Sequence, residues 1–248
     1  MKLKQVKTES NMIKILVKDT SREFMNTLRR LVMCSVPTIA VDEVHIYENT
    51  SNLFDEFLSH RLGLVPLTTD LSYKLGETVK LSLEKEGPGV VYSGDIKSSD
   101  PKVKVADKKI PLTELKKDQK IKLELVAEMN KGKKHVKHIP AVISFNEVPV
   151  ISSKENCTAC EKCVKACPVS VLELKKKKVE LVDPYKCILC GYCRDVCKEE
   201  ALDLSYKDDE FVLSIEPIGQ LDAKEILVKA AELLIERAED FEKALKKI

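Results

Sequence analysis

Eight of the nine cysteines stand in two runs of identical spacing, and these runs constrain the chain more than any other feature. The first run is CTACEKCVKACP over residues 157–168, and the second is CILCGYCRDVC over residues 187–197. Each contains C-x2-C-x2-C-x3-C, the spacing that holds cubane iron–sulfur clusters through thiolates, with the fourth ligand exchanged between the two runs. We therefore expect two ligand sets: Cys157, Cys160, Cys163 and Cys197 for the first cluster, and Cys187, Cys190, Cys193 and Cys167 for the second.

The two runs belong to an internal repeat, because VLEL at 171–174 matches ALDL at 201–204. Two structural zinc ions are an alternative, although zinc modules usually present separated C-x2-C pairs. Disulfides suit secreted chains, whereas the N-terminal MKLKQ has neither the apolar core nor the cleavage site of a signal peptide. The spacing leaves open whether both clusters are [4Fe–4S] or one of them is [3Fe–4S].

The cysteine region resembles the bacterial-type two-cluster ferredoxins. The lead-in VDPYKC at 182–187 is also of the kind those proteins use. One departure is that Cys197 is followed by Lys198, where that family usually has proline. The departure affects the expected loop geometry and leaves all eight ligands in place. Thiolate clusters need a reducing compartment, so we expect the cytoplasm.

Composition limits the classes of function. The 248 residues carry 42 basic and 40 acidic side chains, a net charge of +2, which does not favour a chain that grips a nucleic-acid backbone by itself. No apolar run approaches the ~20 residues that cross a bilayer. The sequence lacks the motifs of a phosphate loop, a zinc protease or a serine hydrolase. The one dense basic block, Lys175–Lys178, is either a solvated turn or a contact surface.

Hydrophobic periodicity predicts a mixture of strands and helices, with residues 71–150 rich in strands. The expected strands cover 12–17, 40–48, 77–83, 90–92, 120–127, 143–148 and 211–217. Thr20 and Glu23 suggest a capping box for a helix that ends at Val36–Pro37, and Cys34 is expected to be a buried thiol near its end. A second, short helix is expected at 53–62, closed by Gly63.

Asp222 is expected to cap a third helix that runs to Lys247, roughly 35–40 Å long. Its apolar stripe consists of Ile226, Ala230, Leu233, Leu234, Ala238, Phe241 and Leu245. A helix of this length exceeds what the rest of the chain can cover, so we interpret it as half of an interface; the alternative is an intramolecular core helix.

A second resemblance rests on the N-terminal half of the chain. The segment NTLRR at 26–30 with VPT at 36–38, the pair Asp55–Glu56 with HRLGL at 60–64, and more weakly GP at 87–88 with VYSGD at 91–95, are similar to motifs of the D-type polypeptide of archaeal DNA-directed RNA polymerase. That polypeptide is the counterpart of bacterial alpha and of the eukaryotic third-largest subunit. Some archaeal members of the family carry a ferredoxin-like insert at the position of the cysteine runs.

This resemblance implies an α+β fold with three domains. It implies a discontinuous, alpha-like dimerisation domain at 1–45 and 206–248, a β-rich insert domain at 46–150, and a ferredoxin-like domain with two iron–sulfur clusters at 151–205. It also implies partner contacts by residues that sequence physics alone would assign to solvated or core positions: Phe24, Leu28, Arg29, Arg30, Leu31, His60, Arg61, Ile226, Ala230, Leu233, Leu234 and Phe241.

The implied function is a non-catalytic assembly scaffold of a nucleotidyltransferase complex. The chain would pair as a heterodimer with the smaller RNA polymerase polypeptide called L, recruit the small polypeptides called N and P, dock on the large catalytic subunits, and meet DNA only within the assembled polymerase. The clusters would be structural, with a regulatory role left open. The alternative is an electron-transfer protein whose flanks are docking domains, although roughly 190 flanking residues without a flavin or nucleotide motif argue against it.

Overall fold

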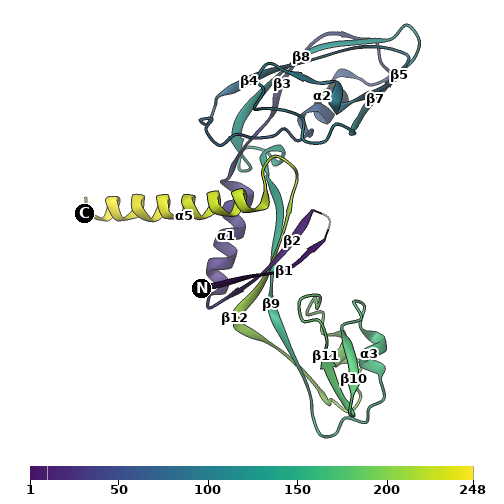
Figure 1. The fold of residues 1–248 in the computed structure, drawn as a ribbon, viewed down its shortest axis with the longest axis vertical. Coiled ribbons are helices and arrows are strands. Elements are labelled where there is room, and N and C mark those ends of the chain that lie inside the picture. Colours follow the sequence, from purple (N-terminus) through teal and green to yellow (C-terminus); the bar gives the residue numbers. More distant parts are fainter. Residues whose placement is uncertain (10, 248) are drawn as a thin grey trace. The chain divides into compact units, whose positions relative to one another are not determined.

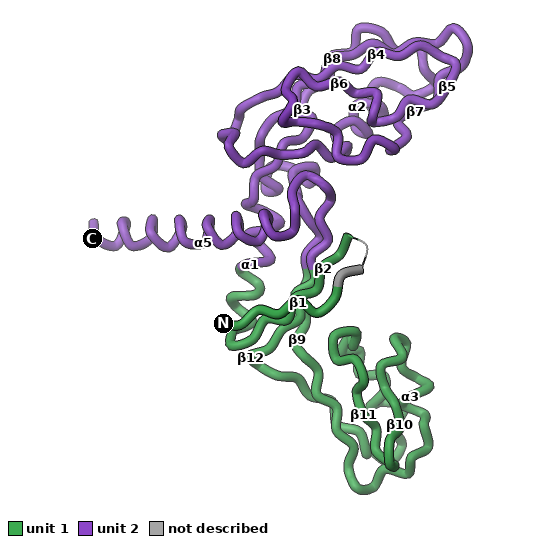
Figure 2. Tube along the Cα trace, in the orientation of Figure 1, with its two compact units in different colours: residues 1–27, 144–214 green, residues 28–143, 215–248 purple. Residues whose placement is uncertain are grey.

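The structure of the protein is a computed structural model that describes residues 1–9 and 11–247. Figure 1 labels its helices and strands where there is room. Antiparallel pairs join Lys2–Glu9 to Met12–Lys18, and Lys120–Lys131 to both Pro37–Asn49 and Thr78–Glu86. Helices are interspersed among the strands, which confirms the α+β class. Two compact units share the chain: one combines Met1–Thr27 with Ser144–Ser214, and the other combines Leu28–Ile143 with Ile215–Ile248 (Figure 2). The three-domain division expected from the sequence remains a prediction.

The first unit contains a four-stranded sheet whose order is β1-β2-β12-β9. These strands are β1 (Lys2–Glu9), β2 (Met12–Lys18), β12 (Leu202–Pro217) and β9 (Ala141–Ser153). Leu16, Val148 and Val212 pack together from three different strands of it. Phe145 and Phe211 meet edge to face at 5.8 Å between ring centroids. Segments far apart in the sequence therefore close one sheet.

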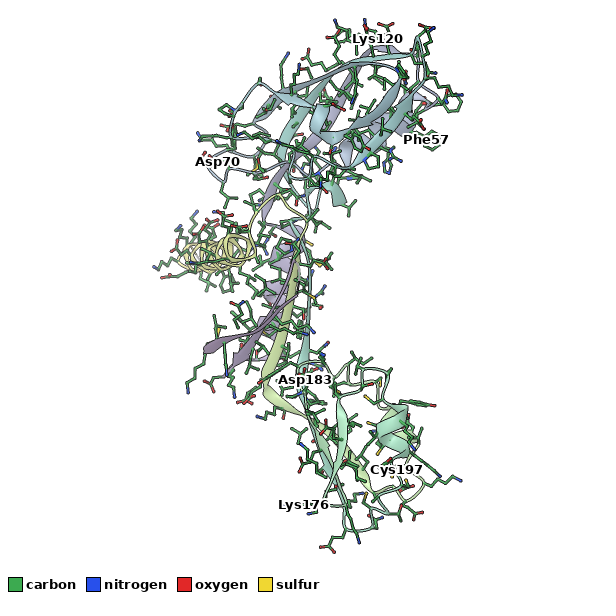
Figure 3. The ribbon with its side chains drawn as sticks, turned by 45° about the vertical axis from the view of Figure 1, so that its right-hand side comes forward. Phe57, Asp70, Lys120, Lys176, Asp183 and Cys197 are labelled. Carbon is green, nitrogen blue, oxygen red and sulfur yellow. The ribbon has the colours of Figure 1, made fainter. Side chains whose placement is uncertain are left out.

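A cysteine-rich lobe belongs to the same unit. It carries the hairpin of β10 (Leu172–Lys175) and β11 (Lys178–Leu181) and the short helices α3 (Lys162–Ala166) and α4 (Tyr192–Asp195). Its apolar core consists of Leu172, Val179 and Leu202 together with two cysteines, Cys163 and Cys193. The lysine block lies in the hairpin turn, where Lys176 projects from the lobe (Figure 3). The buried core of the lobe is therefore small.

The second unit is built on a sheet of order β3-β8-β4-β6 and a two-stranded sheet of β5 and β7. The strands are β3 (Pro37–Asn49), β8 (Lys120–Lys131), β4 (Thr78–Glu86), β6 (Lys97–Ser98), β5 (Gly89–Tyr92) and β7 (Pro111–Leu115). Two 3-10 turns, η1 (Ser93–Asp95) and η2 (Val136–His138), lie between strands. In β4, Val79, Leu81 and Leu83 are buried, as the alternating pattern predicts.

Two helices complete this unit. Helix α2 (Asp55–Gly63) buries Leu58 and Leu62 against the core beneath the sheet. Helix α5 (Ala223–Leu245) begins at Asp222, whose backbone N–H donates to the Glu225 carboxylate at 3.1 Å, so the expected cap is confirmed. Within residues 1–9 and 11–247, no helix has both the length and the apolarity that crossing a membrane requires.

Helix α1 (Arg22–Cys34) corrects two expectations. The residue that caps it is Ser21, whose Oγ accepts from the N–H of Phe24 at 3.3 Å, because the Thr20 N–H is still bound to the Asp209 carbonyl. The prediction that Cys34 is buried is also wrong, since its thiol is exposed. Two positions along a helix correspond to about 200° of rotation, so Cys34 points away from the side on which Val32 is buried.

Candidate metal centre and partner surfaces

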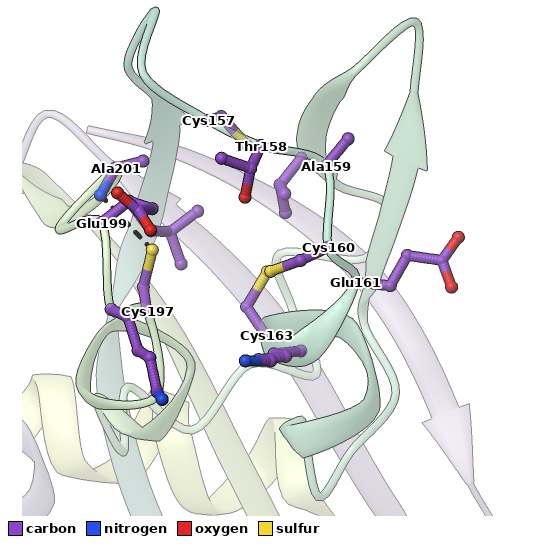
Figure 4. Close-up of a pocket in the computed structure, with 13 residues that line it drawn as sticks. Cys157, Thr158, Ala159, Cys160, Glu161, Cys163, Cys197, Glu199 and Ala201 are labelled. Atoms are coloured by element: carbon purple, nitrogen blue, oxygen red, sulfur yellow. Dashed lines mark hydrogen bonds between the residues drawn. The ribbon is translucent and has the colours of Figure 1, made fainter.

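The first cavity of the cysteine-rich lobe faces four cysteines. Figure 4 shows Cys157, Cys160 and Cys163 on one side and Cys197, from the other run, opposite them. Ala159 and Glu161 adopt positive φ angles of 55° and 58°, which curl the first loop tightly. The Cys197 sulfur accepts a hydrogen bond from the Ala201 N–H at 3.3 Å. The arrangement brings together the first ligand set expected from the spacing.

The second cavity faces the other four cysteines, Cys167, Cys187, Cys190 and Cys193. Leu189 and Gly191 have positive φ angles of 53° and 77°, at the positions that match Ala159 and Glu161 thirty residues earlier. The internal repeat is therefore present in the backbone as well as in the sequence. Both cavities combine three cysteines of one run with the fourth of the other.

The donor set fits iron–sulfur clusters. Each thiolate of a cubane binds a different iron, so a cluster requires four sulfurs facing one cavity, and both cavities supply them. Among the described residues, no three histidine, cysteine, aspartate or glutamate side chains are grouped as ligands of a single metal ion. Each cluster would be held through four cysteine sulfurs, and it would supply the thiolate–iron bonds that crosslink the two halves of the lobe.

The electrostatics of the thiols differ between positions. Burial raises the pKa of the Cys163, Cys187 and Cys193 thiols above the ordinary value. At Cys160 a hydrogen bond from the Lys162 backbone lowers the pKa of the thiol. Because a buried thiolate is costly, ionisation of Cys163, Cys187 and Cys193 would depend on the positive charge of iron bound there.

The partner-binding residues expected on α1 are covered to different degrees. Arg30 is exposed, Phe24, Leu28 and Arg29 are half-buried, and Leu31 is buried. Leu31 therefore contributes to the core of this chain, and a partner could reach it only after a rearrangement. Sequence reasoning missed Met25, which is fully buried.

Helix α5 divides into a covered and an uncovered half. Ile226 and Ala230 are fully buried within the chain, and Leu233 and Leu234 are half-buried. From residue 235 to residue 247 every side chain is exposed, including the expected partner residue Phe241 at 66%. Sequence reasoning missed Ile235, which lies beside the predicted stripe and is also exposed.

On α2 the expected residues His60 and Arg61 are exposed. Arg61 is held within its own unit, because its Nη2 donates to the Pro111 carbonyl at 2.6 Å. Two exposed aromatic side chains were missed here: Phe54 at 72% and Phe57 at 64%. Figure 3 shows Phe57 at the edge of its unit. The available signal for Phe57 was its offset of about 100° around the helix from the buried Leu58–Leu62 stripe.

Two family models match the chain. The RNA polymerase Rpb3/RpoA insert domain matches residues 33–151, and a 4Fe-4S dicluster domain matches residues 133–202. The second match supports iron–sulfur clusters in the lobe.

The chain is similar over nearly its whole length to curated proteins named DNA-directed RNA polymerase subunit Rpo3. The relative from Methanosarcina acetivorans is 37% identical, over 92% of this chain and 91% of the relative. The relative from Methanothermobacter thermautotrophicus is 37% identical over 94% of both chains, and that from Archaeoglobus fulgidus is 36% identical over 95% and 94%. These matches confirm the resemblance stated on the sequence motifs. The chain belongs to the Rpo3 family, the D-type polypeptides of archaeal DNA-directed RNA polymerase.

Proposed function

We propose that the chain is a non-catalytic assembly scaffold that pairs with the smaller polymerase polypeptide L and nucleates assembly in the cytoplasm. The observation that carries this proposal is the uncovered half of α5, residues 235–247. The helical part, from Ile235 to Leu245, is about 16 Å long and presents Phe241 and Leu245 to solvent. Exposed apolar side chains at helical spacing are suited to a matching helix of another polypeptide.

Helix α1 contributes the second part of the proposed pairing surface. Its exposed and half-buried side chains, Phe24, Leu28, Arg29 and Arg30, are available without rearrangement, in contrast to the buried Leu31. The proposed dimerisation domain comprises residues 1–45 and 206–248, with the β-rich and ferredoxin-like domains inserted between its parts. RNA synthesis would take place at magnesium held by other subunits.

The proposed docking surface for N, P and the large catalytic subunits lies on α2. His60, Phe54 and Phe57 are exposed on it, and aromatic side chains are the residue type that most often dominates binding energy at interfaces. DNA would be met only through the assembled polymerase. Similarity over the whole chain, and not over the lobe alone, supports an assembly scaffold over an electron carrier with docking domains.

The clusters have a structural role in this proposal. Two clusters, both [4Fe–4S] or one of them [3Fe–4S], would tie together a lobe whose apolar core is small. Because each cavity takes cysteines from both runs, loss of one cluster would release both halves of the repeat.

Co-expression with L tests the pairing. The two chains should co-purify as a stable heterodimer under anaerobic conditions. If the chain were a monomer without measurable affinity for L, the proposed pairing would be refuted.

A cysteine variant tests the role of the clusters. Replacing Cys157, Cys160 and Cys163 by serine should increase hydrogen exchange over residues 151–205 while pairing with L persists, and later assembly steps should weaken. Cys34→Ser is the matched control, because the Cys34 thiol is exposed and outside both cavities. Normal assembly of the triple variant would show that the clusters have no structural role in assembly.

A further inference from the structure

The two cysteine cavities have the same sulfur ligands and different walls. Thr158 lines the first cavity, and the matching residue thirty positions later, Ile188, lines the second. Glu161 of the first cavity is matched by Gly191 of the second. Because of the internal repeat, the two cavities have similar backbones and can be compared position by position, thirty residues apart, for differences in their side chains.

The contrast is larger after the fourth cysteine of each run. Lys198 and Glu199 line the first cavity, whereas Pro168 and Val169 line the second at the matching positions. Figure 4 shows Glu199 among the residues that line the first cavity. Apart from its cysteines, the second cavity is lined by aliphatic side chains, proline and glycine.

The charges around the first cavity are balanced. Lys162 and Lys198 oppose Glu161 and Glu199, so the walls add no net charge to the site. What separates the two sites is therefore the polarity of their walls. Polar walls let water and small oxidants approach a cluster, and an apolar shell keeps them out.

Within the first ligand set the four sulfurs are unequally covered. Cys160 is exposed, Cys157 and Cys197 are half-buried, and Cys163 is buried. An iron held by Cys160 would be the corner most open to solvent. Cys190 is the matching exposed cysteine of the second set, but its cavity has the apolar wall.

We propose that the two sites react unequally with oxidants. The first site, which contains Cys157, releases iron first, and the iron it loses is the one held by Cys160. The second site, which contains Cys187, is protected and structural. The inference rests on the proposed ligation by eight cysteines and assigns oxidative sensitivity to one half of the repeat. The chain would then carry one oxidant-responsive site and one anchoring site.

A one-electron oxidant such as ferricyanide is sufficient for the loss of one iron from the first site. The oxidant takes one electron from a [4Fe–4S]2+ core, and the resulting 3+ core separates into [3Fe–4S]+ and Fe2+. The bond between iron and the Cys160 sulfur breaks, and the freed thiolate takes a proton from water. Water in the polar cavity hydrates the departing Fe2+, a step that the aliphatic wall of the second cavity disfavours.

The test uses the full chain, isolated anaerobically and titrated with ferricyanide. Paramagnetic resonance follows [3Fe–4S]+, iron analysis follows the fall from about eight to about seven atoms per chain, and alkylation with mass spectrometry identifies the freed thiol. We expect Cys160 to be alkylated well before Cys190. Alkylation of both at the same rate, or of Cys190 first, would overturn the proposal.

Reciprocal exchange of the walls provides a second test. The double variant Lys198→Pro, Glu199→Val gives the first site the wall residues of the second, and it should slow formation of [3Fe–4S]+ about tenfold. The opposite variant, Pro168→Lys, Val169→Glu, should make the second site release iron as well. If neither double variant changed the rate of iron release from an iron-loaded chain, this inference alone would be contradicted. If the chain held zinc, the proposed clusters would be overturned too.

Discussion

Truncation of Phe241 to alanine separates the stability of this chain from its pairing with a partner. Phe241 is 66% exposed and lies in the part of α5 where residues 235–247 are all exposed. Removing its ring should therefore change the free energy of unfolding of the isolated chain by no more than about 0.5 kcal/mol. Ile226, on the same helix, is 0% exposed, and Ile226→Ala should lower that free energy by roughly 2–5 kcal/mol.

The expected effect on pairing follows from the area that remains exposed. A phenylalanine offers roughly 200 Å² for burial, of which 66% leaves about 130 Å² for a partner to cover. At about 25 cal/mol per Å² this amounts to ~3 kcal/mol, and ordering of the side chain reduces it to ~2–3 kcal/mol. We therefore expect Phe241→Ala to weaken pairing with L roughly 30- to 150-fold.

Titration calorimetry of purified L into the anaerobically isolated chain measures this change directly. Lys243→Ala is the matched control, because Lys243 lies on the same exposed turn and its ion pairs with Glu239 and Asp240 are at the surface. Urea unfolding of each variant checks that the fold is retained. If Phe241→Ala changed the dissociation constant less than about twofold, the uncovered half of α5 would not be the pairing surface.

Two further predictions concern the second unit. His138 is buried, its Nδ1 lies 3.0 Å from the Thr38 carbonyl, and desolvation lowers its pKa below the ordinary 6.5. As pH falls below about 6.5, His138 is protonated more readily in the unfolded chain than in the folded one, so the free energy of unfolding should decrease. Urea unfolding at several pH values measures this decrease, and His138→Asn should make it smaller. Gly132→Ala should cost roughly 1–3 kcal/mol in thermal unfolding, since a Cβ there would come within 2.0 Å of the Met33 carbonyl oxygen. Gly63→Ala, whose Cβ would have an ordinary 3.7 Å contact, should be neutral; equal effects of the two would refute the steric argument.

Local sequence patterns predicted those parts of the fold that local chemistry decides. The spacing of the cysteines grouped the same eight residues that line the two cavities, and Asp222 marked the start of α5. The strand at 211–217 was predicted too short, because the charged segment from Tyr206 to Glu210 has no apolar alternation and joins β12 through pairing within the sheet.

Burial was the property that local patterns could not assign. The apolar stripe of α5 has the same spacing at Ile226 and at Phe241, yet the first is enclosed and the second is open. Cys34 was expected inside and lies outside, for a similar reason. The spacing of apolar residues predicts which face of a helix is apolar, but it does not predict which segment of the chain or of a partner covers that face.

The sequence by itself determined the family and the grouping of eight cysteines into two sets that each combine both runs, because both depend on residue identity and spacing. Only the tertiary structure decided which part of α5 is left uncovered, that Ser21 caps α1, and that one cysteine cavity has polar walls and the other aliphatic ones. The physical reason is that solvent access depends on segments brought together from distant parts of the chain, whereas spacing within a loop depends on neighbours alone.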